Sequence, residues 1–186
     1  SAASDVYKRQ VKNPDLVDLT EVGKKQAKSI DENTKEFSIE RIICSGLPRT
    51  LQTAEHIASR REITIECFPL LKEYEWNPDL LKDTKIERFG YLFEDSLAPE
   101  MIGGSEDADE FYRRITCQLE TIIKEDWNEM AAFLHGAVNA AIMCWVNDVD
   151  ISFASKYDQD HAALNIIDID VNEKGKIVRK ILKRYN

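Results

Sequence analysis

The sequence of 186 residues predicts an α/β fold, a three-layer sandwich with a largely parallel central sheet. Two observations predict this class. Short apolar runs typical of buried strands alternate along the chain with longer segments of helical periodicity, as in repeated strand–helix units. Polar residues and glycine directly follow two of these runs, at Ser45-Gly46 and His135-Gly136. Because ligands of such sheets bind beyond the carboxyl ends of the strands, both turns are candidate sites.

The first third of the chain alternates helix and strand. Thr20 is a plausible N-cap of a helix, and the apolar stripe of that helix is Leu19, Val22, Ala27 and Ile30. Residues 42–44 form an apolar run that predicts a buried strand. The next helix is expected to start near Pro48, since proline is tolerated in a first turn. A second strand is predicted where apolar and polar residues alternate, at Ile63, Ile65 and Cys67.

The rest of the chain begins with an irregular stretch, residues 73–103, whose length is typical of a functional wall or lid. Ser105 is expected to cap the following helix, and the buried face of that helix is predicted to be Phe111, Ile115, Leu119 and Ile122. Two further predicted elements are a strand at 130–134 and a helix at 138–146 that is apolar nearly all round. The last two strands are expected near 163–169 and 177–182, with a turn at 172–175.

The composition excludes several classes of protein. A net charge of −9 argues against broad binding to nucleic acids or anionic membranes, which requires a basic surface. No apolar run approaches the ~20 residues that cross a bilayer. The cysteines are too far apart in sequence for a zinc knuckle or a CxxC pair; they are Cys44, Cys67, Cys117 and Cys144. Each lies in an apolar stretch, so we expect reduced core residues and a cytoplasmic location.

Three side chains are candidates for chemistry. Arg49 lies one turn into a helix that follows a strand, where the helix N-terminus and a guanidinium both attract phosphate. A surface arginine paired with Glu55 or a neighbour fits the same spacing equally well. His135 ends an apolar run and suits proton transfer or charge stabilisation, although a hydrogen-bonded histidine at a strand end would look the same. Glu73 lies among aromatic residues that raise a carboxyl pKa, and Glu75 is an equal candidate on chemistry alone.

Five short motifs, in this order, resemble those of the histidine phosphatase superfamily, also called phosphoglycerate-mutase-like. The matching segments are 19–27 (LTEVGKKQA, similar to LTxxGxxQA), 44–54 (CSGLPRTLQTA, similar to SSxLxRAxQTA), 71–73 (LKE, similar to LxE), 103–106 with Phe111 and Arg114 (GGSE…F…R, similar to GGES…F…R) and 133–136 (FLHG, similar to VxHG). Together they span most of the chain, so the match is far more specific than any one motif.

The resemblance implies a phosphomonoester hydrolase. Arg49 would bind the phosphate, and Ser45 and Gly136 would be substrate-binding residues beside it. His135 would stabilise the phosphoryl group in transfer, and Glu73 would protonate the leaving oxygen. Phosphate would pass to a histidine and then to water. The resemblance implies no metal and no organic cofactor; the partner is a small phosphorylated substrate, and nothing indicates the oligomeric state.

The resemblance does not extend to the N-terminus of the chain. The family begins with a strand that ends in Arg-His-Gly, whose histidine is the nucleophile, and residues 6–10 (VYKRQ) contain no histidine. We interpret residues 1–10 as a non-native, adaptor-like segment and residues 11–186 as a single domain that lacks its first strand. This chain is therefore expected to be almost inactive. We also expect the strands at 42–44 and 131–134 to be left with unpaired backbone groups.

Two alternative functions stay open. Phosphoglycerate mutases usually have a longer, more basic region after the glutamate, whereas residues 74–103 are short and carry Lys82, Lys85 and Arg88 against several acids, which favours hydrolysis. A non-catalytic relative that binds a phosphorylated ligand or a partner would also lack the nucleophile.

Overall fold

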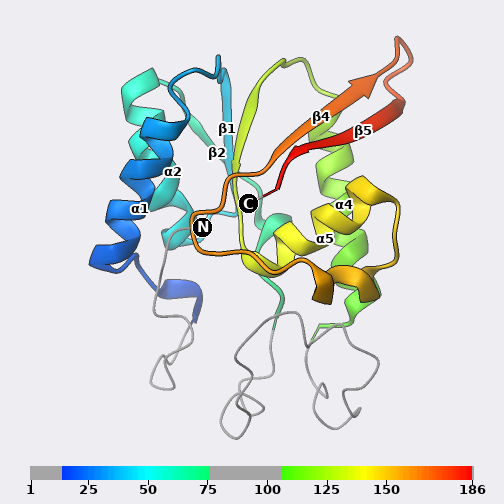
Figure 1. Ribbon diagram of the computed structural model, residues 1–186, viewed down its shortest axis with the longest axis horizontal. Helices are drawn as coiled ribbons and strands as arrows, with labels where there is room; N and C mark the ends of the chain where they lie inside the picture. The colour runs from blue at the N-terminus through cyan, green and yellow to red at the C-terminus, as the bar shows by residue number, and fades with distance from the viewer. Residues whose placement is uncertain (1–13, 76–105, 186) are drawn as a thin grey trace, which may run out of the picture. The chain divides into compact units, whose positions relative to one another are not determined.

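The computed structural model describes residues 14–75 and 106–185, which Figure 1 draws in colour. The chain divides into two compact units. The first unit comprises Ser1–Lys72, Glu125–His135 and Asp160–Leu164, and the second comprises Glu73–Lys124, Gly136–Gln159 and Asn165–Asn186. Most of the irregular stretch predicted at 73–103, the proposed cap Ser105 and the segment 1–10 lie outside the described residues.

A three-stranded parallel sheet forms the centre of the first unit, which confirms the predicted α/β class. Its strands are β1 (Arg41–Cys44), β2 (Ile65–Cys67) and β3 (Met130–Phe133), in the order β2-β1-β3. Ile42 lies opposite Ile65 of β2 and opposite Ala131 of β3. The expectation of unpaired groups on β1 is therefore wrong, because β1 is hydrogen-bonded on both edges and β3 is one of its partners.

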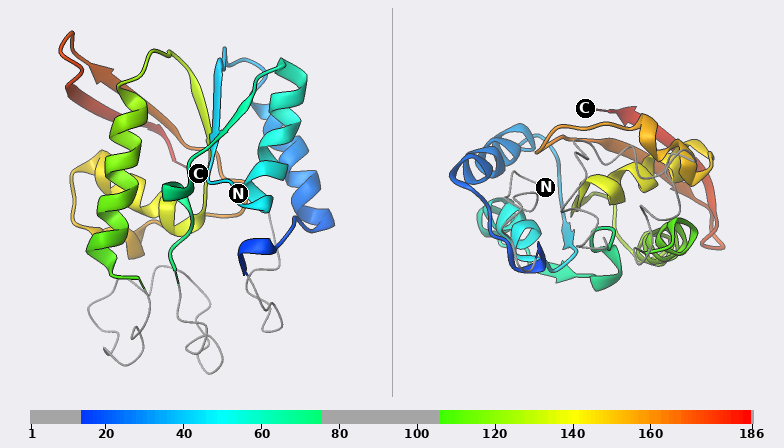
Figure 2. Two further views of the ribbon diagram at one scale, coloured as in Figure 1. Left: turned by 180° about the vertical axis from the view of Figure 1, so that it is seen from behind. Right: turned by 90° about the horizontal axis from the view of Figure 1, so that it is seen from below.

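Two helices pack on one side of this sheet, α1 (Glu21–Asn33) and α2 (Pro48–Arg61) (Figures 1 and 2). As predicted, α2 begins at Pro48. Its apolar face closes a core that contains Ile42, Cys44, Ala54, Ile57, Ala58 and Phe133. Complete burial of an isoleucine such as Ile57 stabilises the fold by roughly 2–3 kcal/mol, so α2 is fixed firmly on the sheet.

Thr20 caps α1 as predicted, with its hydroxyl accepting a hydrogen bond from the amide of Gly23 at 3.0 Å. The predicted apolar stripe is wrong at Val22, whose side chain is 60% exposed. Within α1 only Gly23 and Ala27 are buried. These two are four residues apart on one line of the helix surface, and Val22 falls off that line.

The second unit contains α4 (Ala108–Ile123), α5 (Gly136–Asn147), the 3₁₀ helix η5 (Ile151–Lys156) and two strands. The predicted buried face of α4 is confirmed, and α5 is buried along nearly all of its length, as its uniformly apolar sequence predicts. The cap of α4 is Asp107, whose carboxylate accepts a hydrogen bond from the amide of Glu110 at 2.9 Å. The proposed cap at Ser105 is therefore wrong: aspartate caps as well as serine does, and the helix begins after Asp107.

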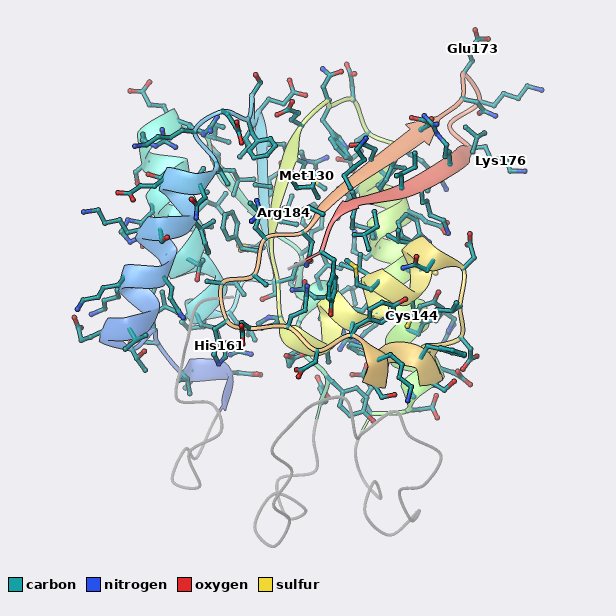
Figure 3. The ribbon with its side chains drawn as sticks, in the orientation of Figure 1. Met130, Cys144, His161, Glu173, Lys176 and Arg184 are labelled. Carbon is teal, nitrogen blue, oxygen red and sulfur yellow. The ribbon has the colours of Figure 1, made fainter. Side chains whose placement is uncertain are left out.

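The two strands of this unit form an antiparallel hairpin, β4 (Ile166–Val171) and β5 (Ile177–Arg184). The turn lies where it was predicted, and Gly175 there has a φ of +71°, a conformation that glycine adopts without strain. Asn172 stabilises the turn by accepting hydrogen bonds from the amides of Lys174 and Lys176. Figure 3 shows Glu173 and Lys176 at the exposed tip of the hairpin.

The cysteines depart from the expectation of four core residues. Cys44 and Cys144 are buried, but Cys67 and Cys117 are exposed, and all four are free thiols. Cys44 and Cys67 lie opposite each other on β1 and β2, with their sulfur atoms 3.7 Å apart. Positions 23 residues apart in sequence thus become neighbours through the register of two parallel strands.

Candidate functional site

The turn that follows β1 brings two hydroxyl groups and one imidazole together. Ser45 Oγ lies 2.8 Å from His135 Nε2 and 3.0 Å from Thr50 Oγ1. Ser45 and His135 are 2% and 1% exposed, and Thr50 is fully buried. Gly46, with a φ of +85°, lets the chain turn sharply out of the strand. The turn then passes directly into the first residues of α2.

His135 meets Ser45 because their strands are parallel neighbours in register. Cys44 is the last residue of β1 and lies opposite Phe133, the last residue of β3. The chain segments that leave the two strands therefore emerge at the same edge of the sheet. This is the carboxyl edge, where parallel sheets bind ligands. Gly136, the other predicted substrate-binding residue, directly follows His135 and is the exposed first residue of α5.

Arg49 lies in the first turn of α2 and is 4% exposed. The alternative of a surface arginine is wrong in its position, because Arg49 is buried. The hydroxyl of Thr53 donates a hydrogen bond of 2.7 Å to the carbonyl of Arg49 and braces this turn. A guanidinium at a helix N-terminus supplies fixed positive charge and paired donors, which suit phosphate oxygens.

Glu73 and Glu75 belong to the second unit and differ in their surroundings. Glu73 is partly buried, and its Oε1 accepts a hydrogen bond from the amide of Tyr74 at 3.0 Å. Glu75 is exposed, and its amide donates to the carboxylate of Glu106 at 3.2 Å. A carboxyl that serves as a general acid needs surroundings that keep a proton on it near neutral pH. Glu73 is the less exposed of the two, and which of them serves as the acid stays a prediction.

Arg114 of α4 holds the segment that carries Glu73. Its guanidinium binds both carboxylate oxygens of Glu106, through Nε at 2.5 Å and Nη2 at 2.8 Å. Nη2 also donates to the carbonyl of Glu73 at 3.2 Å. The Tyr74 hydroxyl donates to the carbonyl of Glu106. Arg114 and Glu106 were noted in the sequence only as part of a motif, and no spacing rule indicates this role.

Tyr74 is 6% exposed, and its ring packs edge-on against Phe111. Burial raises the pKa of the Tyr74 phenol to about 12, and the nearby charges of Glu106 and Asp107 add to the effect. The phenol therefore stays protonated at neutral pH and remains a hydrogen-bond donor to the Glu106 carbonyl. The two remaining histidines, His56 and His161, are both exposed, which agrees with the expectation that His56 lies on the helix surface.

A separate cavity of about 370 Å³ lies at the opposite, amino-terminal end of the sheet. Its residues are Glu40, Arg41, Glu66, Glu125, Asp126 and Trp127. Arg41 binds Glu66 through two hydrogen bonds of 2.7 and 2.8 Å and Glu125 through a contact of 2.5 Å. Its guanidinium lowers the pKa of Glu66 by hydrogen bonding. The charge of Arg41 is thus taken up by two carboxylates, and among the residues that line this cavity in the described part of the chain Arg41 is the only cation.

Two general findings apply to residues 14–75 and 106–185. No helix there combines the length and the apolar character that crossing a membrane requires. In the same residues, no three or more His, Cys, Asp or Glu side chains group closely enough to hold a metal ion.

Comparisons with known proteins agree with this fold. Phosphoserine phosphatase 1 of Hydrogenobacter thermophilus is 27% identical over 171 residues, which cover 88% of this chain and 80% of that protein. A mycobacterial glucosyl-3-phosphoglycerate phosphatase solved with VO3 has a TM-score of 0.77 and 18% identity, and the alignment covers 100% of this chain and 95% of the other. The α-ribazole phosphatase of Shigella flexneri has a TM-score of 0.71 and 18% identity, covering 92% and 85%. The family model of the histidine phosphatase superfamily (branch 1) matches residues 3–181, and the chain belongs to this superfamily.

Proposed function

We propose that this protein is a phosphomonoesterase-type domain that binds phosphate monoesters at the carboxyl edge of its parallel sheet. The observation that carries the proposal is the contact of 2.8 Å between His135 and Ser45, on the same turn that leads into the buried Arg49. Buried cationic and hydroxyl groups suit the charge of a phosphoryl group. The substrate is a small phosphorylated molecule, and neither a metal nor an organic cofactor takes part.

In the proposed chemistry each residue has one task. Arg49 binds phosphate oxygens through its paired donors, and Ser45 and Gly136 are further substrate-binding residues. His135 stabilises the phosphoryl group in transfer. Glu73 protonates the leaving oxygen. In the complete reaction a histidine takes the phosphoryl group and passes it to water, which divides one difficult step into two easier ones.

The nucleophile of that reaction has no counterpart among the three histidines of this chain, His56, His135 and His161. His56 and His161 are exposed, and His135 has its own task. We therefore propose that this chain is nearly inactive and retains binding. This favours the non-catalytic, phosphate-binding alternative for this chain over a mutase. We also propose a cytoplasmic location, because all four cysteines are free thiols.

Binding of inorganic phosphate or vanadate tests the proposal. Arg49→Ala should reduce the affinity at least about tenfold, since charge-assisted hydrogen bonds contribute roughly 1.5–3 kcal/mol. Affinity should also fall with added salt. The matched control is Arg60→Ala on the same helix, whose guanidinium binds Asp31 instead. Equal affinities of Arg49→Ala and the parent chain would refute the proposed site.

Hydrolysis of an aryl phosphate tests the catalytic part. The chain should show no turnover above that of His135→Ala. A variant in which an apolar strand ending in Arg-His-Gly precedes Asn13 should gain activity. In that variant Glu73→Gln should lower turnover of substrates with poor leaving groups about 10²–10⁴-fold, whereas Glu75→Gln should not. A large loss of turnover in Glu75→Gln and none in Glu73→Gln would instead identify Glu75 as the proton donor.

A further inference from the structure

Two cysteines lie side by side at the start of the turn proposed to bind phosphate, which runs from Ser45 to Arg49. Cys44 ends β1 and Cys67 ends β2, and the two residues are partners in the parallel register. Neighbouring strands lie about 4.8 Å apart, within the range of Cα separations that a disulfide spans. The sulfur atoms are 3.7 Å apart. A closure of roughly 1.6 Å would therefore bring them to the bonded distance of about 2.05 Å.

The two thiols differ in a way that orders the chemistry. Cys67 is exposed, so a dissolved oxidant can reach it. Cys44 is fully buried, and burial raises the pKa of its thiol to about 11. Cys67 is therefore the thiol that reacts first, and Cys44 is the one that resolves the intermediate from inside the sheet.

The pair is connected to the phosphate-binding turn through the backbone. The amide of Gly46 donates a hydrogen bond of 3.3 Å to the sulfur of Cys44. Gly46 also lies close to Cys67, because a Cβ placed on Gly46 would be 3.5 Å from the Cβ of Cys67. Ser45, which contacts His135, lies between Cys44 and Gly46 in the chain. Any movement of the Cys44 sulfur toward β2 therefore acts on the turn from Ser45 to Arg49.

We propose that Cys44 and Cys67 form a reversible intrachain disulfide that alters the turn from Ser45 to Arg49. Its effect on phosphate rests on the proposed function. The oxidant is a low-molecular-weight disulfide such as oxidised glutathione. The Cys67 thiolate attacks one of its sulfur atoms, the S–S bond breaks, and one small thiol leaves. The Cys44 thiolate then attacks Cys67 Sγ and releases the second thiol. The cysteines lose two electrons and two protons, and the small disulfide is reduced to two thiols.

Oxidation of the full chain with excess oxidised glutathione tests the proposal. Under denaturing conditions the thiol count should fall by two, and peptide mapping should link the Cys44 and Cys67 peptides. Dithiothreitol should reverse the change. Cys117→Ser removes the other exposed cysteine and should still form the link. Cys67→Ser should not form it. A mixed disulfide that accumulates on Cys67, or a link that involves Cys117, would overturn the proposal.

Hydrogen exchange tests the effect on the turn. The Gly46 amide should exchange about fivefold faster in the oxidised chain, as the loss of one weak hydrogen bond implies. The amides of α1 should not change. Unchanged exchange at residues 45–49 in a chain shown to be cross-linked would overturn the coupling. Neither measurement requires bound phosphate, so failure of the proposed function, seen as equal affinities of the Arg49→Ala variant and the parent, is distinguishable from failure of this inference.

Discussion

His135 Nε2 and Ser45 Oγ lie within hydrogen-bonding distance, at 2.8 Å, although 90 positions separate the two residues in sequence. The serine hydroxyl also contacts Thr50 Oγ1 and accepts a hydrogen bond from the amide of Leu47 at 3.3 Å. One hydroxyl therefore joins the end of β3, the turn after β1 and the start of α2. The imidazole of His135 contacts this junction through Nε2.

Ser45→Ala removes all three contacts at a buried position. The variant should lose about 1–3 kcal/mol of unfolding free energy, since buried polar partners lose a hydrogen bond, and it should bind phosphate more weakly. Urea denaturation and phosphate titration measure the two effects. Ser59→Ala on the exposed side of α2 is the control and should stay within about 0.5 kcal/mol of the parent. A Ser45→Ala variant as stable as Ser59→Ala would show that the junction is not structural.

Arg114→Ala should destabilise the second unit and loosen the segment of Glu73. The substitution removes the two hydrogen bonds to the Glu106 carboxylate and the hydrogen bond to the Glu73 carbonyl. The Arg114 side chain is only 19% exposed. We expect a loss of about 2–4 kcal/mol by denaturation. Arg114→Lys should recover only part of this stability, because an ammonium group cannot form the two parallel hydrogen bonds that the planar guanidinium makes to one carboxylate.

The neighbouring exposed residue supplies the matched control. Arg113→Ala removes the same charge one position earlier on α4 and should change stability by less than about 0.5 kcal/mol. Comparable losses in Arg113→Ala and Arg114→Ala would attribute the effect to helix charge and not to the contact with Glu106.

Tyr74→Phe should change how stability depends on alkaline pH. The folded pKa of Tyr74 is raised to about 12 from its ordinary 10.0. Below pH 10.0 both states are protonated and the contribution of the phenol is fully present. As the pH rises from 10.0 toward 12, the unfolded state releases the proton first, so the contribution is lost. Over this window the parent should lose on the order of 2 kcal/mol more than Tyr74→Phe.

Unfolding free energies of both proteins, measured at neutral pH and across that window, check this sign. Tyr74→Phe should be less stable at neutral pH, because the hydrogen bond to the Glu106 carbonyl is lost. The difference should shrink as the pH rises. A difference that is constant at every pH would mean that Tyr74 is solvated in the folded protein.

The sequence predicted those helix starts and buried helix faces that depend on residues close together in the chain. Pro48 at the start of α2, Thr20 at the start of α1 and the buried face of α4 depend on residues a few positions apart. Arg49 and His135 could be placed at strand ends for the same reason. The resemblance of the motifs supplied their proposed tasks, which the spacing alone left open.

What the sequence did not predict depends on contacts between distant segments. The proximity of Cys44 and Cys67 follows from strand register, which single-chain periodicity does not encode. Direct pairing of β1 with β3 was missed for the same reason. The choice of Asp107 over Ser105 as the cap of α4 was open because both residue types cap equally well.

β1 is the middle strand of its sheet, and the turn proposed to bind phosphate starts at the residue after it. The same short stretch, residues 42–49, is thus both the centre of the core and the frame of the site. In a saturation mutagenesis screen scored by phosphate capture, Ile42 and Ile43 should rank with Arg49, although their fully buried side chains only fill space. A measurement of folded protein yield beside the screen would separate these two kinds of sensitivity.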